Sequence, residues 1–386
     1  MAVPHPHKQL HAVPFEQRAP TRTRVDRLLS LDAFRGIAVA GMILVNNPGS
    51  WDDVYAPLRH SAWNGWTVAD LLFPFFLFIV GVAVTLSLAP DPKRPQSWQP
   101  IFFKVVRRAA LIFALGVFLN GFPRFDWSTL RIPGVLQRIA LCYFAASVVV
   151  MTLEVKEQVI VTVLLLVGYW TLMQLTSIAF PDGPETNFAA QVDDALLHGH
   201  LLHDGWDPEG LVTTIPAIAT TLSGVLCGFW LVSARRPAER VAGLLVAGNL
   251  ALLIGSIANQ LWPINKSLWS ASYVVFTSGM ALNVLGVCDW LIDLKGYRRW
   301  ATPFVVFGTN PIVAYVLSSL LTKVMLLWTI ARPDGSTIDL ERYIFDGVFS
   351  SSRNPAAASL AYALAYVGLW LGITGFLYRH RVVIKI

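Results

Sequence analysis

The sequence predicts an all-α polytopic membrane protein of about ten transmembrane helices, with both termini in the cytoplasm. Composition is the first reason: 55% of the 386 residues are hydrophobic and 14% are charged, whereas soluble domains are about 25% charged. Segment length is the second, because about 20 apolar residues span a bilayer. Such segments lie near 31–50, 67–89, 101–121, 133–153, 158–180, 211–233, 240–262, 268–292, 301–330 and 357–378.

The basic residues predict the orientation, because Lys and Arg concentrate in cytoplasmic loops. With the N-terminus inside, twenty of them fall in cytoplasmic segments and seven in outer segments. The net charge of +6 therefore reflects topology and attraction to membrane lipid, and no nucleic-acid partner is expected. Residues 1–27 are interpreted as a disordered basic cytoplasmic tail, and 28–386 as a single transmembrane domain.

Several ionisable residues lie within or next to the predicted spans, where each costs about 2.5 to 3.5 kcal/mol on insertion. Asp32 and Arg35 are three residues apart, so they either pair on one helix face or lie at the cytoplasmic interface. Asp70 begins a span, where a carboxylate typically caps a helix. Arg138 lies deeper and needs a partner, for which Asp70 and Glu209 are candidates.

A polar pocket that opens to the outside is predicted from residues near the ends of the spans. Gly308 and Pro311 flank Asn310 and predict a break in the ninth span, and broken helices at membrane depth typically line a cavity. Glu209, Asn265 and Lys266 lie in the segments that precede the sixth and eighth spans.

Histidine is the side chain that gains and loses a proton near neutral pH. His60 lies in the outer segment RHSAWNG together with Trp63 and Asn64. On the residues alone, a single histidine in a loop is more often incidental than functional. The histidines of HGHLLH are two and five residues apart, which does not place them on one helix face, and no metal site is expected.

Six segments, in order from about 27 to 325, resemble the heparan-α-glucosaminide N-acetyltransferase family, including its bacterial relatives. They are RLLSLDAFRGIAVAGMILVNN, RHSAWNGWTVADLLFPFFLFIVG, LRIPGVLQRIALCYF, WDPEGLVTTIPAI, WPINKSLWSASYVVFTSG and FGTNPIVAY. The resemblance implies a transmembrane enzyme that moves an acetyl group from cytoplasmic acetyl-CoA to the amino group of a terminal glucosamine across the membrane. It also implies catalytic roles for His60 and Asn46. The large luminal N-terminal region of lysosomal members is absent here, which favours a bacterial inner-membrane location.

The resemblance also suggests which residues bind the two substrates. The phosphates of acetyl-CoA are expected to meet arginines, namely Arg35, Arg107, Arg108, Arg138, Arg298 and Arg299, although topology alone also favours basic residues at inner helix ends. The amino sugar or oligosaccharide acceptor is expected to contact Trp63, Asn64, Asp70, Glu209, Asn265, Lys266 and Asn310. The outer segment 181–210 contains acidic residues but no Lys or Arg, which favours a cationic amine.

Two chemical routes and two other functions stay open at this point. His60 acts either as a general base for the acceptor amine or as a nucleophile that carries the acetyl group. Asn46, Asn64 and Asn310 are candidate donors to the developing oxyanion. A secondary transporter of amino sugars and an O-acyltransferase of an envelope glycan also fit. The oligomeric state is open, with a homodimer among the alternatives.

Overall fold

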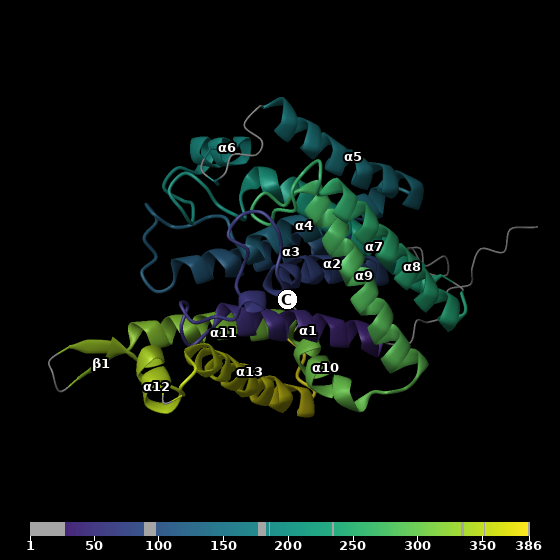
Figure 1. The fold of residues 1–386 in the computed structure, drawn as a ribbon. Helices are drawn as coiled ribbons and strands as arrows, with labels where there is room; N and C mark the ends of the chain where they lie inside the picture. Colours follow the sequence, from purple (N-terminus) through teal and green to yellow (C-terminus); the bar gives the residue numbers. More distant parts are fainter. Residues whose placement is uncertain are drawn as a thin grey trace, which may run out of the picture.

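The computed structural model describes residues 28–88, 98–176, 183–184, 186–233, 235–332, 336–350 and 352–384. The predicted tail, 1–27, lies outside the described residues. Within them the chain is mainly helical, and its long helices run side by side in one bundle (Figure 1). The predicted all-α membrane fold is therefore confirmed.

Each of the ten predicted spans contains a long helix or a helix pair. These are α1 (Leu29–Asn46), α2 (Val68–Leu88), α3 (Trp98–Gly121), α4 (Val135–Thr152), α5 (Val155–Leu175), α7 (Leu211–Val232), α8 (Pro237–Ala258), α9 (Ala271–Cys288), the pair α10 (Thr302–Thr309) and α11 (Pro311–Leu327), and α13 (Pro355–Arg379). Within the described ranges, eight helices are long and apolar enough to cross a membrane, or nine if the α10–α11 pair is one span. The remaining helix, α3, is 24 residues long and includes Lys104, Arg107 and Arg108.

The ninth predicted span is broken, as expected, at Asn310. The axes of α10 and α11 differ by 74°, and Pro311 begins α11. Proline has no N–H to donate to the preceding turn, so the hydrogen bonding of α10 cannot continue through it. Gly308 is required by packing, because a Cβ there would lie 1.9 Å from the carbonyl oxygen of Asp32 in α1.

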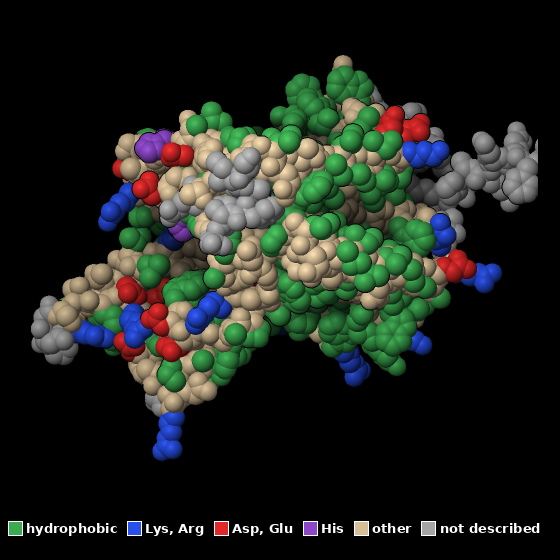
Figure 2. All heavy atoms as spheres, turned by 45° about the horizontal axis from the view of Figure 1, so that its top comes forward, with side chains coloured by type: hydrophobic (Ala, Val, Ile, Leu, Met, Phe, Trp, Pro, Cys, Tyr) green, Lys and Arg blue, Asp and Glu red, His purple; other side chains and the backbone are tan. Residues whose placement is uncertain are grey.

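The helices divide into a central group and a peripheral group. In α1 and α2, 67% and 72% of the membrane-length window is buried, whereas the values for α5, α8 and α13 are 22%, 22% and 28%. On the face shown in Figure 2, hydrophobic side chains dominate the middle of the molecule and charged side chains gather toward its two ends. This distribution is typical of a protein surrounded by lipid.

The connections contain only short elements. They are η1 (Ala56–Leu58), α6 (Phe188–Leu197), η2 (Asp289–Leu294), η3 (Arg299–Ala301), the antiparallel strands β1 (Thr329–Ala331) and β2 (Thr337–Asp339), and α12 (Leu340–Val348). Ile330 is opposite Ile338 in the strand pair. In Figure 1, α6, β1 and α12 lie toward one end of the bundle, which is the predicted outer end.

Candidate active site

A histidine and a carboxylate form a pair at the N-terminus of α2. His60 Nδ1 lies 2.7 Å from Asp70 Oδ1. The other carboxylate oxygen of Asp70 accepts hydrogen bonds from the main-chain N–H groups of Ser61 and Thr67, each at 3.0 Å. Asp70 therefore caps α2 as predicted, and the same carboxylate also orients the imidazole.

The ammonium group of Lys266 completes this cluster from a distant part of the sequence. Lys266 Nζ lies 3.0 Å from His60 Nδ1 and 3.3 Å from Asp70 Oδ1. Burial lowers the pKa of Lys266, and the negative charge of Asp70 opposes that effect. The His60 side chain is 41% exposed, whereas the Asp70 side chain is fully buried. The imidazole is thus the member of the cluster that a ligand can reach.

The partners of His60 indicate its tautomer. A carboxylate only accepts hydrogen bonds, so Asp70 favours a proton on Nδ1. Nε2 then carries the lone pair that a general base or a nucleophile requires, and the Lys266 ammonium lies 3.4 Å from it. The pair can therefore take up a proton or attack a carbonyl carbon.

Asn64 and Asn265 join the loops that carry His60 and Lys266. Asn265 Nδ2 donates to Asn64 Oδ1 at 3.2 Å, and Asn265 Oδ1 accepts from the N–H of Leu268 at 2.8 Å. Asn265 is fully buried, whereas Asn64 is exposed. The carboxamide of Asn265 is therefore engaged in holding the two loops together.

Glu209, which the sequence suggested as a partner for Arg138, belongs to a different ion-pair cluster. Arg131 donates two hydrogen bonds of 2.8 Å to Asp207 and one of 2.6 Å to Glu209. This cluster fixes the segment that precedes α7. From the sequence, Arg131 was placed on the outer side of the membrane and was given no further role.

Arg138 is held by neutral groups rather than by a carboxylate. Its Nη2 donates to Thr213 Oγ1 at 2.5 Å and to the carbonyl of Gly210 at 3.2 Å, and the guanidinium lies 5.0 Å from the centre of the Trp269 ring. The side chain is fully buried. Asp70, the other suggested partner, is bonded to His60.

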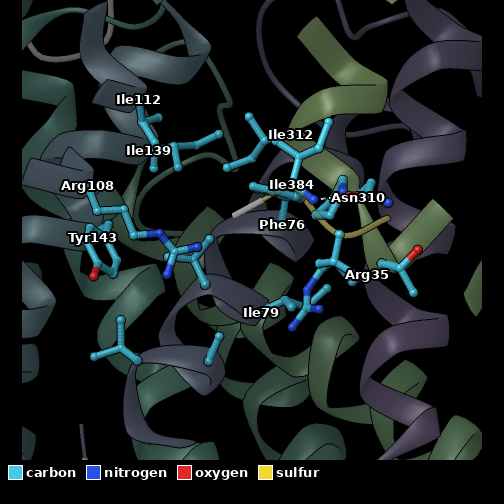
Figure 3. A pocket seen from close by; sticks show the side chains of 16 residues that line it. Arg35, Phe76, Ile79, Arg108, Ile112, Ile139, Tyr143, Asn310, Ile312 and Ile384 are labelled. Atoms are coloured by element: carbon cyan, nitrogen blue, oxygen red, sulfur yellow. Dashed lines mark hydrogen bonds between the residues drawn. The ribbon is translucent and has the colours of Figure 1, made fainter. Parts of the chain in front are cut away.

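A cavity of about 360 Å³ lies in the centre of the bundle, lined by α1, α2, α3, α4 and the α10–α11 break (Figure 3). Its walls are mainly apolar and include Phe76, Ile79, Ile112, Ile139 and Ile312. Along α2 the lining residues run from Phe76 to Val84, away from the end that bears Asp70.

Two arginines supply the positive charge of the cavity. Arg35 Nη1 donates to Asp32 Oδ1 at 3.1 Å and to the carbonyl of Gly308 at 3.2 Å, so the ion pair, one of the two alternatives left open for Asp32 and Arg35, is present. Arg108 lies over the ring of Tyr143, 5.1 Å from its centre. In Figure 3 both guanidinium groups point into the cavity.

The remaining predicted cofactor, substrate and catalytic residues do not lie together. Arg107, Arg298 and Arg299 are exposed, and Asn46 is exposed at the last residue of α1. Asn310 lines the central cavity and does not belong to the cluster around His60. The predicted polar pocket is therefore divided between two sites.

The aromatic and histidine residues of the outer loops contact one another. Trp63 packs edge-on against Trp206, with 6.4 Å between ring centres, and His203 stacks on Trp206 at 4.4 Å. His198 Nδ1 pairs with Asp194 at 2.7 Å, and His200 Nδ1 bonds to the carbonyl of Leu130 at 2.8 Å. Each of these histidines has its own partner.

Comparison with known proteins decides the family. A family model for the catalytic region of heparan-alpha-glucosaminide N-acetyltransferase matches residues 27–257, which includes His60 and Asp70. The chain belongs to the heparan-alpha-glucosaminide N-acetyltransferase family. Lys266, Asn310 and the segment after α13 lie beyond the matched range.

Two curated members of this family are similar over most of the chain. The chain is 32% identical to heparan-alpha-glucosaminide N-acetyltransferase of Mus musculus over 357 residues, which covers 76% of this chain and 54% of the mouse protein. It is 30% identical to the Homo sapiens protein of the same name over 354 residues, covering 75% and 52%. The chain thus spans about half the length of these relatives.

Several residues that build the site gave little signal in the sequence. Tyr273 is buried in α9, and its hydroxyl donates to the main-chain carbonyl of Asp70 at 2.5 Å. Val383 and Ile384, after the last helix, line the cavity. A tyrosine in an apolar span and two aliphatic residues near the end of a sequence do not by themselves indicate a site.

Proposed function

We propose that this chain is a transmembrane acetyltransferase that moves an acetyl group from cytoplasmic acetyl-CoA to the amino group of glucosamine, or of a saccharide that ends in glucosamine. The observation that carries the proposal is that one helix, α2, bears both Asp70 and the wall of the central cavity. Phe76 is six residues after Asp70, which is about 9 Å along the helix axis. We infer that a donor in the cavity extends along α2 toward His60.

The cavity has the features that coenzyme A requires. Arg35 and Arg108 line it, and guanidinium groups bind phosphates through charge-assisted hydrogen bonds. Val84 is 14 residues from Asp70 along α2, about 21 Å of rise. We expect the narrow pantetheine arm to extend along α2 from the cavity, so that its thioester approaches the end that bears His60.

The cluster around His60 supports proton transfer during acyl transfer. The acceptor amine must lose a proton as its nitrogen attacks the thioester carbonyl carbon, and His60 Nε2 takes up that proton. The carbon–sulfur bond then breaks, and the coenzyme thiolate leaves and is protonated. Asp70 stabilises the imidazolium that forms, as an oriented carboxylate does in other acyl-transfer enzymes.

The contacts of the three candidate asparagines reduce the number of possible donors to the oxyanion. The carboxamide nitrogen of Asn310 already donates to Val382, whereas Asn46 and Asn64 are exposed. We therefore propose Asn46 or Asn64 as the donor to the tetrahedral intermediate.

The proposal is tested with purified protein, acetyl-CoA and a panel of amino sugars. We expect N-acetylated glucosamine and free CoA to appear in equal amounts. Acetylated product on a hydroxyl group would instead support an O-acyltransferase. Accumulation of unchanged amino sugar in proteoliposomes, without release of CoA, would contradict the proposal and support a transporter.

A further inference from the structure

The segment that follows α13 returns into the centre of the bundle. Arg381 has a φ of +56°, and the N–H of Val382 bonds to the carbonyl of Leu377 at 2.9 Å. This six-to-one bond after a left-handed residue is a Schellman motif, which ends a helix and reverses the chain. Val383 and Ile384 consequently line the central cavity, and Figure 3 shows Ile384 beside Phe76.

Asn310 fixes this segment through both atoms of its carboxamide. Asn310 Nδ2 donates to the carbonyl of Val382, and Oδ1 accepts from the N–H of Ile384, both at 2.9 Å. The two bonds go to one planar group, so Val382 C=O and Ile384 N–H point the same way. In an extended segment the intervening residue points its N–H and C=O the opposite way.

The N–H and C=O of Val383 are unpaired among the residues that the structure describes. Within the described part of the chain, no hydrogen bond joins the N–H or C=O of Val383 to another residue. Val383 is also 53% exposed as a residue, and it lines the cavity.

The polar groups of the donor require hydrogen-bond partners inside the cavity. The pantetheine arm of coenzyme A contains two secondary amides, and burying an amide without a hydrogen-bond partner is costly. The walls of the cavity are mostly aliphatic and aromatic, and the carboxamide of Asn310 is already engaged. An extended ligand with amide groups can pair with a free strand edge, as peptides do in β-strand addition.

We propose that the segment 382–384 is part of the donor site, and that the N–H and C=O of Val383 pair with an amide of the pantetheine arm. This inference rests on the proposed function. It assigns the segment after α13 to coenzyme binding, with Asn310 as the residue that positions it.

The test is CoA binding to the purified full-length protein, measured by isothermal titration calorimetry. Val383→Pro removes the N–H, because proline has no main-chain donor. Val383→Ala is the matched control, because it shortens the side chain and keeps the N–H. We expect Val383→Pro to raise the Kd for CoA about fivefold more than Val383→Ala does, as for the loss of one hydrogen bond.

A second variant, which ends at Arg381, removes the segment without introducing a proline. It therefore separates loss of the segment from a local distortion caused by proline. We expect this shortened chain to bind CoA at least as weakly as Val383→Pro, while it still unfolds in one cooperative transition. CoA binding equal to that of the unaltered chain in both variants would overturn the inference, and so would tighter binding by the shortened chain. Equal weakening in Val383→Ala and Val383→Pro would overturn the main-chain pairing. Absence of CoA binding by the unaltered chain would instead overturn the proposed donor.

Discussion

His60 Nδ1 lies 2.7 Å from Asp70 Oδ1, and the same carboxylate accepts the N–H groups of Ser61 and Thr67. One buried group thus caps α2 and orients the imidazole. The arrangement makes the tautomer of His60 depend on the charge of Asp70, and this dependence can be measured.

Asp70→Asn should lower kcat for acetyl transfer roughly 10²- to 10⁴-fold. An asparagine can still accept a main-chain N–H, but its NH₂ group donates toward His60 Nδ1 and leaves the proton on Nε2. Steady-state rates with acetyl-CoA and glucosamine give the result. Asp53→Asn is the control, because Asp53 lies in the same loop and bonds to Ser50. A rate within threefold of the unaltered chain for Asp70→Asn would mean that the pair does not act in catalysis.

Arg108→Gln should raise the KM for acetyl-CoA about tenfold and leave the KM for the acceptor nearly unchanged. Arg108 lines the cavity, and a charge-assisted hydrogen bond to phosphate contributes about 1.5 to 3 kcal/mol. The neighbouring Arg107 is not among the described residues that line the cavity, so Arg107→Gln is a matched control that changes the same net charge. Equal effects of the two substitutions would show that general surface charge, rather than a defined contact, attracts the donor.

The stability of the outer region should depend on pH through Asp193. Burial, with a further contribution from the charge of Asp207, raises the pKa of Asp193 to about 6, although the N–H of Leu211 opposes the shift. A raised carboxyl pKa means that the folded state favours the neutral form, so this contribution is full below about pH 4 and is lost as pH rises through 6.

Asp193→Asn should remove this pH dependence, which amounts to about 3 kcal/mol at most. The asparagine keeps an oxygen that can accept the N–H of Leu211, which bonds to Asp193 at 2.8 Å. Melting temperatures between pH 4.5 and 7 provide the measurement. An identical pH profile in the variant and the unaltered chain would show that Asp193 does not change its protonation in this range.

The spans could be predicted from the sequence because their signal is local. Twenty apolar residues are readable in one window, and the Gly308 and Pro311 pair correctly predicted the break between α10 and α11. Asp70 was correctly predicted to cap α2, since capping depends on neighbouring residues. The predictions that depended on neighbouring residues in the sequence, namely the spans, the break and the cap, therefore agreed with the structure.

The assembly of the site could not be predicted, because it depends on packing between distant segments. Lys266 is 206 residues from His60, and no spacing rule relates them. Arg107 and Arg108 are adjacent in sequence, yet only the packing of α3 determines which one lines the cavity. The partner of Arg138 was wrongly sought among carboxylates, because the sequence did not reveal that Arg131 neutralises Glu209.

The most direct test of the proposed function is the acetyl-transfer rate of His60→Ala with acetyl-CoA and glucosamine. His198→Ala is the matched control, since His198 also forms a 2.7 Å pair with an aspartate on the outer loops but lies in a separate cluster. Incubation with radioactive acetyl-CoA without acceptor separates the routes, because only a covalent mechanism labels the unaltered protein. We expect His60→Ala to lose at least 10²-fold in rate with CoA binding and melting temperature retained, and His198→Ala to keep normal activity. A near-normal rate in His60→Ala would contradict the account.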